Sequence, residues 1–374
     1  MIGIAALGSV QDINCWSNIP YFFFKQGFED GIFNDPWNLD LSDFGVSRKY
    51  WNLLNLLCFN KPGGYQYSAS FLNKAESLIP AHYFSQTIIS FNQVFPRAET
   101  VKSAGGKIIY YIDMTLTDLF LDPSYNVKIG HKMKRVAIEQ ETKNYKLADM
   151  VITMGRWPIE TLRTNYGMSE TKLGHIRPGA NLFLKSGWKG SSFKHGAGLD
   201  RELVLGFIGK DWERKGLGIL IEIKRELHRR GFKVKLKIIG NCPIEWQHEL
   251  GVEFLGLINK MVEADKFVNE IATCDIGCLF SKGEALGISV LEFLAVGVPV
   301  AGFFHQGLKD TLLPGASIRF MLDESIVTIS DKFQEFITDS NYQHNLKTRA
   351  EELSSTVTWK SCIDSWSKTL KVNL

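Results

Sequence analysis

The sequence lacks the residue patterns that mark metal-binding and disulfide-linked proteins. Its six cysteines are scattered over 374 residues and form no Cys-x-x-Cys pair, and the eight histidines show no metal-ligand spacing. No Asp-x-Asp motif is present to hold a divalent cation. Dispersed thiols in a chain of this length are typical of a reducing compartment. We therefore expect a cytoplasmic protein with no metal site and no cofactor.

Long apolar runs and a strong excess of one charge are also missing. No stretch reaches the roughly twenty apolar residues that span a bilayer, and the first residues lack the basic start and apolar core of a signal peptide. The chain has 43 basic and 40 acidic residues, a net charge of +3, which gives no reason to expect a nucleic-acid partner. Its 45% hydrophobic and 22% charged content is that of a globular protein with a full core.

Short apolar runs alternate with helical periodicity along most of the chain, which predicts an α/β fold. The expected strands are 2–7, 108–112, 150–153, 173–176, 203–208, 234–239, 252–255, 276–280 and 299–302. The expected helices are 19–28, 69–77, 132–147, 216–230, 262–272, 286–296, 341–353 and 359–370. A glycine-rich segment, residues 185–200, predicts a linker between the two halves. We expect an N-terminal domain over 1–184, a C-terminal domain over 201–358, and a last helix, 359–374, that packs on the first domain.

Two glutamates in the second half, Glu284 and Glu292, are spaced eight positions apart. Glu284 follows a predicted strand, and Glu292 lies about two turns into the helix predicted after it. The start of that helix exposes unpaired N–H groups and the positive end of a dipole. Amides suit a phosphate and carboxylates suit hydroxyls, so the pattern indicates a site for a sugar nucleotide.

Three cations gather where another strand of the same predicted sheet ends. Lys210, Arg214 and Lys215 follow strand 203–208 and precede helix 216–230. Basic residues are more favourable at the end of a helix than at its start, so this cluster indicates a bound anion. A solvated loop would also explain a basic run, but the glutamate pair in the same sheet favours the anion site.

With these motifs the sequence resembles the family 4 retaining glycosyltransferases, or glycosyl transferases group 1, of the GT-B fold. The resemblance rests on residues 209–216, 254–256, 272–275, 284–292 and 297–299, and it covers most of residues 203–310. It implies two Rossmann-like doubly wound domains that face each other across a cleft. The first would bind the acceptor and the second the nucleotide sugar.

The resemblance also implies roles for the charged residues. Lys210 and Lys215, with Arg214 beside them, would bind the donor diphosphate. Glu284 would contact the donor sugar, and Glu292 would hold the ribose hydroxyls. The amides expected to meet the sugar and the phosphate are those of Ala285, Leu286 and Gly287.

The N-terminal half resembles the family more loosely. Residues 15–21 are similar to a loop that often reads Trp-Ser-Gly-x-Pro-Tyr, which places Ser17 and Asn18 at the diphosphate. Asn18 stands where a glycine is usual, and Asn tolerates left-handed backbone better than most residues. Residues 111–115 resemble a segment whose polar residue faces the reacting sugar. Asp113 is therefore a catalytic candidate beside Glu284, although a simple strand-end cap would also account for it.

The implied function is a retaining, metal-independent glycosyltransferase of the hexosyltransferase type. It would move a sugar from a nucleotide-diphosphate donor to a saccharide or lipid-linked saccharide, in surface polysaccharide or glycolipid synthesis. The alternatives are a GT-B sugar-nucleotide epimerase or phosphorylase, and an inactive nucleotide-binding subunit. No lysine motif for pyridoxal phosphate favours the phosphorylase, whereas Asn18 gives weak support to the inactive subunit.

One segment bears on a membrane partner. Residues 47–59 combine basic and aromatic residues with a leucine face, a composition suited to peripheral contact with a membrane surface. The basic run 128–135 would add electrostatic attraction to the inner face of the membrane. A helix packed in the core of the first domain would explain the leucines equally well.

Overall fold

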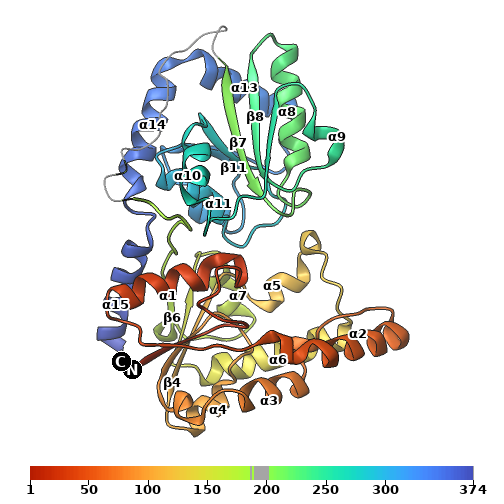
Figure 1. Ribbon diagram of the computed structural model, residues 1–374, viewed down its shortest axis with the longest axis vertical. Coiled ribbons are helices and arrows are strands. Elements are labelled where there is room, and N and C mark those ends of the chain that lie inside the picture. The colour runs from red at the N-terminus through yellow and green to blue at the C-terminus, as the bar shows by residue number, and fades with distance from the viewer. Residues whose placement is uncertain (186–187, 189–201, 374) are drawn as a thin grey trace. The chain divides into compact units, whose positions relative to one another are not determined.

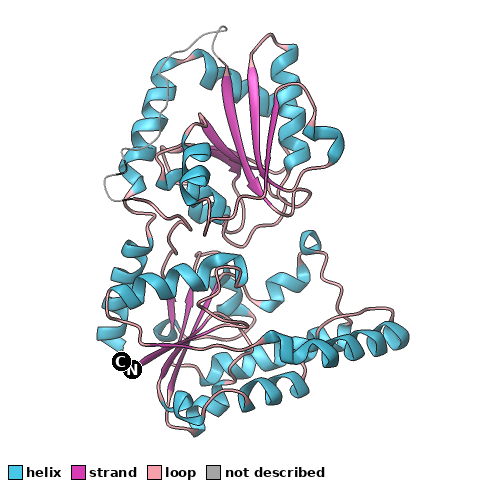
Figure 2. Cartoon of the chain, viewed as in Figure 1, coloured by secondary structure: helices cyan, strands magenta, loops and turns pink. Residues whose placement is uncertain are grey.

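The computed structural model describes residues 1–185, 188 and 202–373, which form two compact units (Figures 1 and 2). Unit 1 comprises Met1–Pro178 and Cys362–Leu374, and unit 2 comprises Gly179–Ser361. The predicted linker, 185–200, lies outside the described residues except for 185 and 188. Within the described ranges, no helix combines the length and the apolar character that crossing a membrane requires.

Unit 1 is built on a sheet of six parallel strands in the order β2-β1-β3-β4-β5-β6. The strands are β1 (Ile2–Ala5), β2 (Asp35–Pro36), β3 (Thr87–Ser90), β4 (Lys107–Ile112), β5 (Met150–Thr153) and β6 (Leu173–His175). Because strands β1 and β3 are neighbours, the order reverses between them, as in doubly wound sheets. The isoleucines of β3 and β4 are fully buried, as expected for a parallel sheet covered on both faces.

The helices of this unit are α1 (Ile19–Glu29), α2 (Gly45–Phe59), α3 (Ala69–Ser77), α4 (Ala98–Ser103), α5 (Leu116–Leu121), α6 (His131–Leu147), α7 (Pro158–Thr164) and most of the C-terminal α15 (Trp359–Asn373). Short 3₁₀ turns are η1 (Trp16–Asn18), η2 (Leu41–Phe44), η3 (Tyr65–Tyr67), η4 (Ala81–Ser85), η5 (Pro123–Tyr125) and η6 (Glu170–Lys172). In α15, Trp366 contacts the rings of Phe23 and Tyr111, at centroid distances of 5.6 and 5.1 Å.

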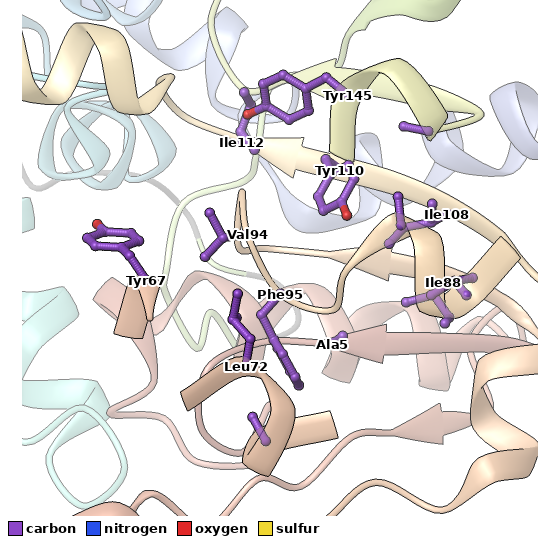
Figure 3. Packing of buried hydrophobic residues seen from close by; sticks show 14 of the residues in the cluster. Ala5, Tyr67, Leu72, Ile88, Val94, Phe95, Ile108, Tyr110, Ile112 and Tyr145 are labelled. Atoms are coloured by element: carbon purple, nitrogen blue, oxygen red, sulfur yellow. The ribbon is translucent and has the colours of Figure 1, made fainter. Parts of the chain in front are cut away.

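The core of unit 1 mixes aliphatic strand residues with aromatic helix and loop residues (Figure 3). Tyr110 of β4 is fully buried, and its hydroxyl donates to the carbonyl of Pro96 at 2.7 Å. Tyr145 of α6 packs edge-on against Tyr110, with 5.6 Å between ring centroids. The Tyr110 hydroxyl thus has a partner, which removes most of the cost of placing it in an apolar core.

Unit 2 has a second sheet of six parallel strands, in the order β12-β11-β10-β7-β8-β9. The strands are β7 (Leu203–Gly209), β8 (Val234–Gly240), β9 (Val252–Gly256), β10 (Ile276–Leu279), β11 (Val300–Phe303) and β12 (Ser317–Phe320). Its helices are α8 (Leu217–Arg229), α9 (Ile244–Gln247), α10 (Ala264–Ala272), α11 (Ile288–Ala295), α12 (Leu308–Thr311), α13 (Ile326–Thr338) and α14 (Ser340–Ser354). Starting from β7, the chain adds strands first on one side and then, from β10, on the other. The switch point of the sheet therefore lies between β7 and β10.

The predicted α/β class with two doubly wound sheets is confirmed. Strands β2, β3 and β12 were missed, and the predicted helix 286–296 begins later and is shorter, as α11 (Ile288–Ala295). Strand β3 has only four residues, Thr-Ile-Ile-Ser, and comes one residue after the 3₁₀ turn η4. So short an apolar run carries no periodicity, and only its neighbours β1 and β4 make it a central strand.

A buried carboxylate, that of Glu141 on α6, fixes the start of α5. Its oxygens accept hydrogen bonds from the Leu116 N–H at 3.0 and 3.1 Å, from the Tyr145 hydroxyl at 2.7 Å and from the Tyr166 hydroxyl. Burial raises the pKa of Glu141 to about 8, although the hydrogen bonds from Tyr166, Leu116 and Tyr145 act in the opposite direction. The folded protein therefore binds a proton here more tightly than the unfolded chain does.

This shift predicts that the stability of the protein falls as the pH rises. The stabilising contribution is complete below about pH 4.5 and is lost as the pH rises through about 8. The loss in the free energy of unfolding should be on the order of a few kcal/mol. Glu141→Gln removes the titration and should flatten the pH dependence measured by urea unfolding. Glu139→Gln, on the exposed side of the same helix, should leave it unchanged. An equal pH slope in wild type and Glu141→Gln would contradict the assignment.

Candidate active site

The charged residues singled out in the sequence lie at the switch point of the unit 2 sheet. Residues 210–216 follow β7, and residues 280–287 follow β10, its neighbour in the sheet. Because the two strands are parallel, both loops leave the same edge of the sheet. In open α/β sheets this edge is where ligands bind.

The two loops are held together by close backbone contacts. Gly216 has φ = +77°, and a Cβ atom there would lie 2.1 Å from the Phe280 carbonyl oxygen. The Arg214 carbonyl accepts hydrogen bonds from the Lys282 N–H and the Ser281 hydroxyl, both at 3.1 Å. Only a glycine permits both this backbone conformation and this approach. The position of Gly216 therefore sets the distance between the loops that carry the charges.

Glu284 lies between two cations. Its Oε2 atom is 3.3 Å from Lys215 Nζ and 3.4 Å from Arg214 Nη1, and Oε1 accepts a hydrogen bond from the Gly287 N–H at 3.2 Å. The Glu284 side chain is only 10% exposed. Burial by itself would raise the pKa of Glu284, but the charges of Lys215 and Arg214 outweigh it and lower the pKa. Glu284 is therefore an ionised carboxylate held in one position.

Arg214 and Lys215 are themselves held in place. The Arg214 guanidinium also donates to the Gly283 carbonyl at 2.7 Å and to Asp211 Oδ2 at 3.0 Å. The Lys215 stem crosses Gly209 at the end of β7, where a Cβ atom would lie 2.7 Å from Lys215 Cδ. Lys210 is exposed and takes no part in the Glu284 pairs. Arg214 and Lys215 are thus fixed at the edge of the sheet, where their charges can bind an anion.

The backbone after Glu284 differs from the prediction. Because α11 begins at Ile288, its N-cap is Gly287, with φ = +81°. The Gly287 amide already serves Glu284, and so is not available to a ligand while that bond persists. Ala285 and Leu286 are buried, and a Cβ atom at Gly307 would lie 1.9 Å from the Ala285 carbonyl oxygen. Residues 284–287 thus form a turn stabilised by the Glu284 side chain, and contact of the Ala285, Leu286 and Gly287 amides with a donor stays a prediction.

Glu292 lies on α11, and its side chain is 2% exposed. It forms an ion pair with Lys260, a residue of the loop between β9 and α10 that sequence reasoning missed. Burial raises the pKa of Glu292, whereas the charge of Lys260, its hydrogen bond and the charge of Lys215 act in the opposite direction. Lys215 thus lies close enough to influence both glutamates. A buried glutamate that stays ionised needs a nearby cation or several hydrogen-bond donors, but no local pattern around Lys260 identifies it as that partner.

The remaining predicted residues belong to unit 1. Trp16, Ser17 and Asn18 have φ values of +29°, +57° and +67°, a run of three left-handed non-glycine residues that leads into α1. The Asn18 side-chain amide donates to the Ile13 carbonyl. Asn18 therefore takes the left-handed conformation expected of a glycine, at a cost in strain that is characteristic of functional loops. Asp113 is half-buried directly after β4.

Within the unit 1 sheet, strand β3 separates β1, which precedes Ser17 and Asn18, from β4, which precedes Asp113. The structure brings together Arg214, Lys215, Glu284 and Glu292 in unit 2. Lys210 lies on the same loop without joining their ion pairs.

Comparison with known proteins finds a family similar to much of the second unit. Residues 191–353 match the family described as Glycosyl transferases group 1. This matched stretch is called the group 1 domain here, after the family that it resembles. The match includes both charged loops and the whole of the switch point.

Curated relatives of the group 1 domain match over part of their length. A putative colanic acid biosynthesis glycosyltransferase, WcaL of Salmonella typhimurium, is 26% identical over 156 residues, 37% of each chain. A capsular polysaccharide biosynthesis glycosyltransferase, CapM of Staphylococcus aureus, is 25% identical over 185 residues, 46% of this chain and 48% of that protein. The matched part thus spans between a third and a half of these relatives.

Solved structures match the group 1 domain together with unit 1. HepE of Anabaena, in complex with UDP and glucose, superposes with a TM-score of 0.66 at 16% identity and 100% coverage of both chains. WaaG, a glycosyltransferase involved in lipopolysaccharide biosynthesis, has a TM-score of 0.63 at 12% identity, with 99% of each chain covered. The GT-B fold expected from the sequence is confirmed.

The contact between Gly216 and Phe280 predicts a large effect of adding one methyl group. Gly216→Ala places a methyl group against a carbonyl oxygen at a position with φ = +77°. Gly231→Ala, at the other end of α8, adds the same methyl group at a similar φ of +88°, but there it meets no other atom. The Gly231 variant should lose about 1–2 kcal/mol in the free energy of unfolding. The Gly216 variant should lose at least about 2 kcal/mol more, because the loops must separate. Urea unfolding of both variants measures the difference. Equal losses would show that the loop contact is not tight.

Proposed function

We propose that the protein is a retaining, metal-independent glycosyltransferase that uses a nucleotide-diphosphate sugar. The observation that carries this proposal is the cluster of Arg214, Lys215 and Glu284 at the switch point, with Glu292 close to Lys215. Cations bind a diphosphate, and carboxylates accept hydrogen bonds from the hydroxyls of a sugar and a ribose. The cluster supplies both within one group 1 domain.

The cations would act on the leaving group. Transfer of a glycosyl group builds negative charge on the departing diphosphate, and Arg214 and Lys215 are fixed before substrate arrives by their bonds to Glu284, Gly283 and Asp211. Charges that need no reorganisation stabilise a transition state most effectively. In our proposal these side chains do the work that a divalent metal performs in other transferases, with Lys210 as an additional diphosphate contact.

The carboxylates would orient the donor. Glu284 is ionised and anchored by the Gly287 amide, so it can accept hydrogen bonds from hydroxyls of the donor sugar. Glu292 would accept hydrogen bonds from the ribose hydroxyls. In unit 1, we propose that Ser17 and Asn18 contact the diphosphate and that Asp113 faces the reacting sugar.

The names of the relatives guide the choice of substrates. WcaL and CapM are described as enzymes of colanic acid and capsular polysaccharide biosynthesis, which supports a saccharide or lipid-linked saccharide acceptor. The HepE structures contain UDP with glucose or UDP-glucose, so UDP is the first nucleotide to try.

Binding and rate measurements test the proposal. Thermal unfolding with UDP, GDP, ADP and TDP should show one strong binder, worth about 2.7 kcal/mol at a concentration 100 times its Kd. The corresponding sugar nucleotide should be hydrolysed slowly, and EDTA should not reduce that rate. Lys215→Met should lower the rate about 100-fold or more. Lys282→Met, an exposed lysine of the neighbouring loop, serves as the matched control and should not.

Each alternative has its own outcome in these experiments. Stabilisation by none of the nucleotides would exclude the proposal, and binding without hydrolysis or transfer would indicate an inactive subunit. Interconversion of the free sugar nucleotide with another would indicate an epimerase. The anomeric configuration of a transferred sugar, read by NMR, tests retention.

We further propose that unit 1 contacts a membrane surface through helix α2. Its outer face exposes Val46, Tyr50, Leu53 and Leu57, which are between 54% and 83% exposed and follow helical spacing. On the opposite face, the Asn52 side-chain oxygen accepts a hydrogen bond from the Gly63 N–H at 3.2 Å. Trp51 on that face packs against the core of unit 1, and its indole donates to the Gly63 carbonyl at 3.1 Å. The helix therefore presents its leucines to solvent, whereas a helix in the core of the unit would bury them.

Positive charge accompanies this apolar face. Helix α2 contains no acidic residue, and Arg48 and Lys49 on it are exposed. The segment after α2 packs against the start of α6, where a Cβ atom at Gly63 would lie 3.0 Å from the Lys128 carbonyl oxygen. The exposed Lys128 therefore joins the same region. An apolar helix face flanked by cations is suited to an anionic lipid surface, where a lipid-linked acceptor would reside.

Vesicle sedimentation tests the membrane contact. The protein should bind vesicles that contain phosphatidylglycerol and bind poorly to pure phosphatidylcholine, and added salt should weaken the binding. The double variant Leu53→Glu/Leu57→Glu should bind at least about tenfold more weakly. The control Ile244→Glu/Leu250→Glu alters two apolar residues of unit 2 that are similarly exposed, and it should bind like wild type. Equal loss in both variants, or loss of a dimer instead of vesicle binding, would contradict the contact.

A further inference from the structure

A lysine of an exposed loop reaches into the group 1 domain to pair with a buried carboxylate. Lys260 lies between β9 and α10, in a loop where Leu257, Met261 and Val262 are 61%, 51% and 80% exposed. The Lys260 side chain is nevertheless only 14% exposed, because its ammonium ends at Glu292. Neither of the motifs that predicted the donor site includes this residue.

The Lys260 ammonium has three partners. It donates to Glu292 Oε1 and to the Asn181 carbonyl, the latter at 3.2 Å, and it lies 4.3 Å from the centroid of the Phe267 ring. An ammonium group has three N–H donors, and three acceptors surround it here. No donor of Lys260 is left for a phosphate or a base, so its action is on Glu292 and not on a ligand.

The partners of Lys260 are themselves fixed. Asn181 is fully buried, and its side-chain oxygen accepts a hydrogen bond from the Trp359 indole at 3.1 Å. The adjacent Ala180 N–H donates to the Val357 carbonyl at 2.8 Å. Phe267 of α10 is 2% exposed. The ammonium is thus held from three sides by rigid parts of unit 2, and a ligand at Glu292 would not have to displace it.

The pairing leaves acceptor capacity on Glu292. A carboxylate has two oxygens with about four lone-pair directions, and Lys260 uses one of them on Oε1. The other charge that faces Glu292 is that of Lys215, which comes from the loop after β7. A neutral carboxylic acid would present a proton to a hydroxyl and lose part of this capacity. The charge on Glu292 therefore decides how well it can hold a diol.

We propose that Lys260 is a positioning residue that keeps Glu292 ionised and oriented, so that Glu292 accepts hydrogen bonds from both hydroxyls of the donor ribose. This inference rests on the proposed function, because it assumes that Glu292 binds the ribose. The β9–α10 loop would therefore raise the affinity for the nucleotide through Glu292, without touching the nucleotide itself. The loop would thereby set the pH range over which the enzyme binds its donor.

The test is the pH dependence of nucleotide binding. The Kd of UDP, or of GDP if the melting experiment selects it, is measured by calorimetry from about pH 6 to about pH 9 for wild type, Lys260→Met and Lys260→Arg. Wild type should vary little. Lys260→Met should bind at least about tenfold more weakly near pH 6 and recover as the pH rises, because Glu292 without its cation takes up a proton. Lys260→Arg keeps the charge and should restore the flat profile.

Two controls make the result specific. Lys266→Met removes an exposed lysine of α10 that pairs with Glu263 at 2.8 Å, and it should bind like wild type. In a Glu292→Gln background, Lys260→Met should add little further loss, since the two residues act as one unit. The loss caused by Lys260→Met should also be smaller for the 2′-deoxy nucleotide, which offers Glu292 one hydroxyl less.

The outcomes separate this inference from the function on which it rests. If wild type binds no nucleotide, the proposed function fails. Suppose that wild type binds the nucleotide. If Lys260→Met then binds it equally well or more tightly, or more weakly by the same factor at every pH, the proposed role of Lys260 is wrong. The proposed donor site would not be affected by that result. Thermal unfolding of each variant without nucleotide confirms that it is folded.

Discussion

The structure of the candidate site depends on one ion cluster at the switch point of the unit 2 sheet. Glu284 leaves the end of β10, Arg214 and Lys215 leave the end of β7, and the parallel pairing of these strands brings them to one edge. Neither loop would hold its charges alone, because like charges repel and a buried carboxylate without a partner takes up a proton. Gly216 makes the cluster possible, since its contact with Phe280 leaves no room for a side chain.

Three buried glutamates show how the surroundings decide the use of one residue type. Glu141 is bonded to hydroxyls and an amide and has no cation beside it, so its pKa is raised and it serves the packing of α5. Glu284 has two cations and a lowered pKa. Glu292 lies between these cases, because the charges of Lys260 and Lys215 only partly offset its burial. An enzyme that must present ionised carboxylates to hydroxyls needs cations beside them, as at Glu284 and Glu292. The arrangement at Glu141 instead stabilises the fold.

Much of the fold and part of the site could be predicted from the sequence. Alternating strands and helices gave the class, and the spacing of Glu284, Glu292, Arg214 and Lys215 reflects strand ends that one sheet must bring together. Strand β3 was missed because four residues carry no period. The start of α11 was misplaced by two residues because Ala285 and Leu286 are good helix formers, whereas the bond from the Gly287 amide to Glu284 holds this segment as a turn.

What the sequence could not supply are contacts between distant loops. An ionised buried glutamate on α11 requires a polar or charged partner, and many lysines are available. Lys260 is selected by the path of the loop between β9 and α10 and by acceptors on Asn181 and Phe267. Helix α2 presents the reverse problem. Its leucine pattern fits a core or a surface, and only the hydrogen bonds of Trp51 and its polar neighbours decide which face turns inward. In both cases the sequence pattern indicates that a side chain or helix face needs a partner, and only the tertiary structure determines what that partner is.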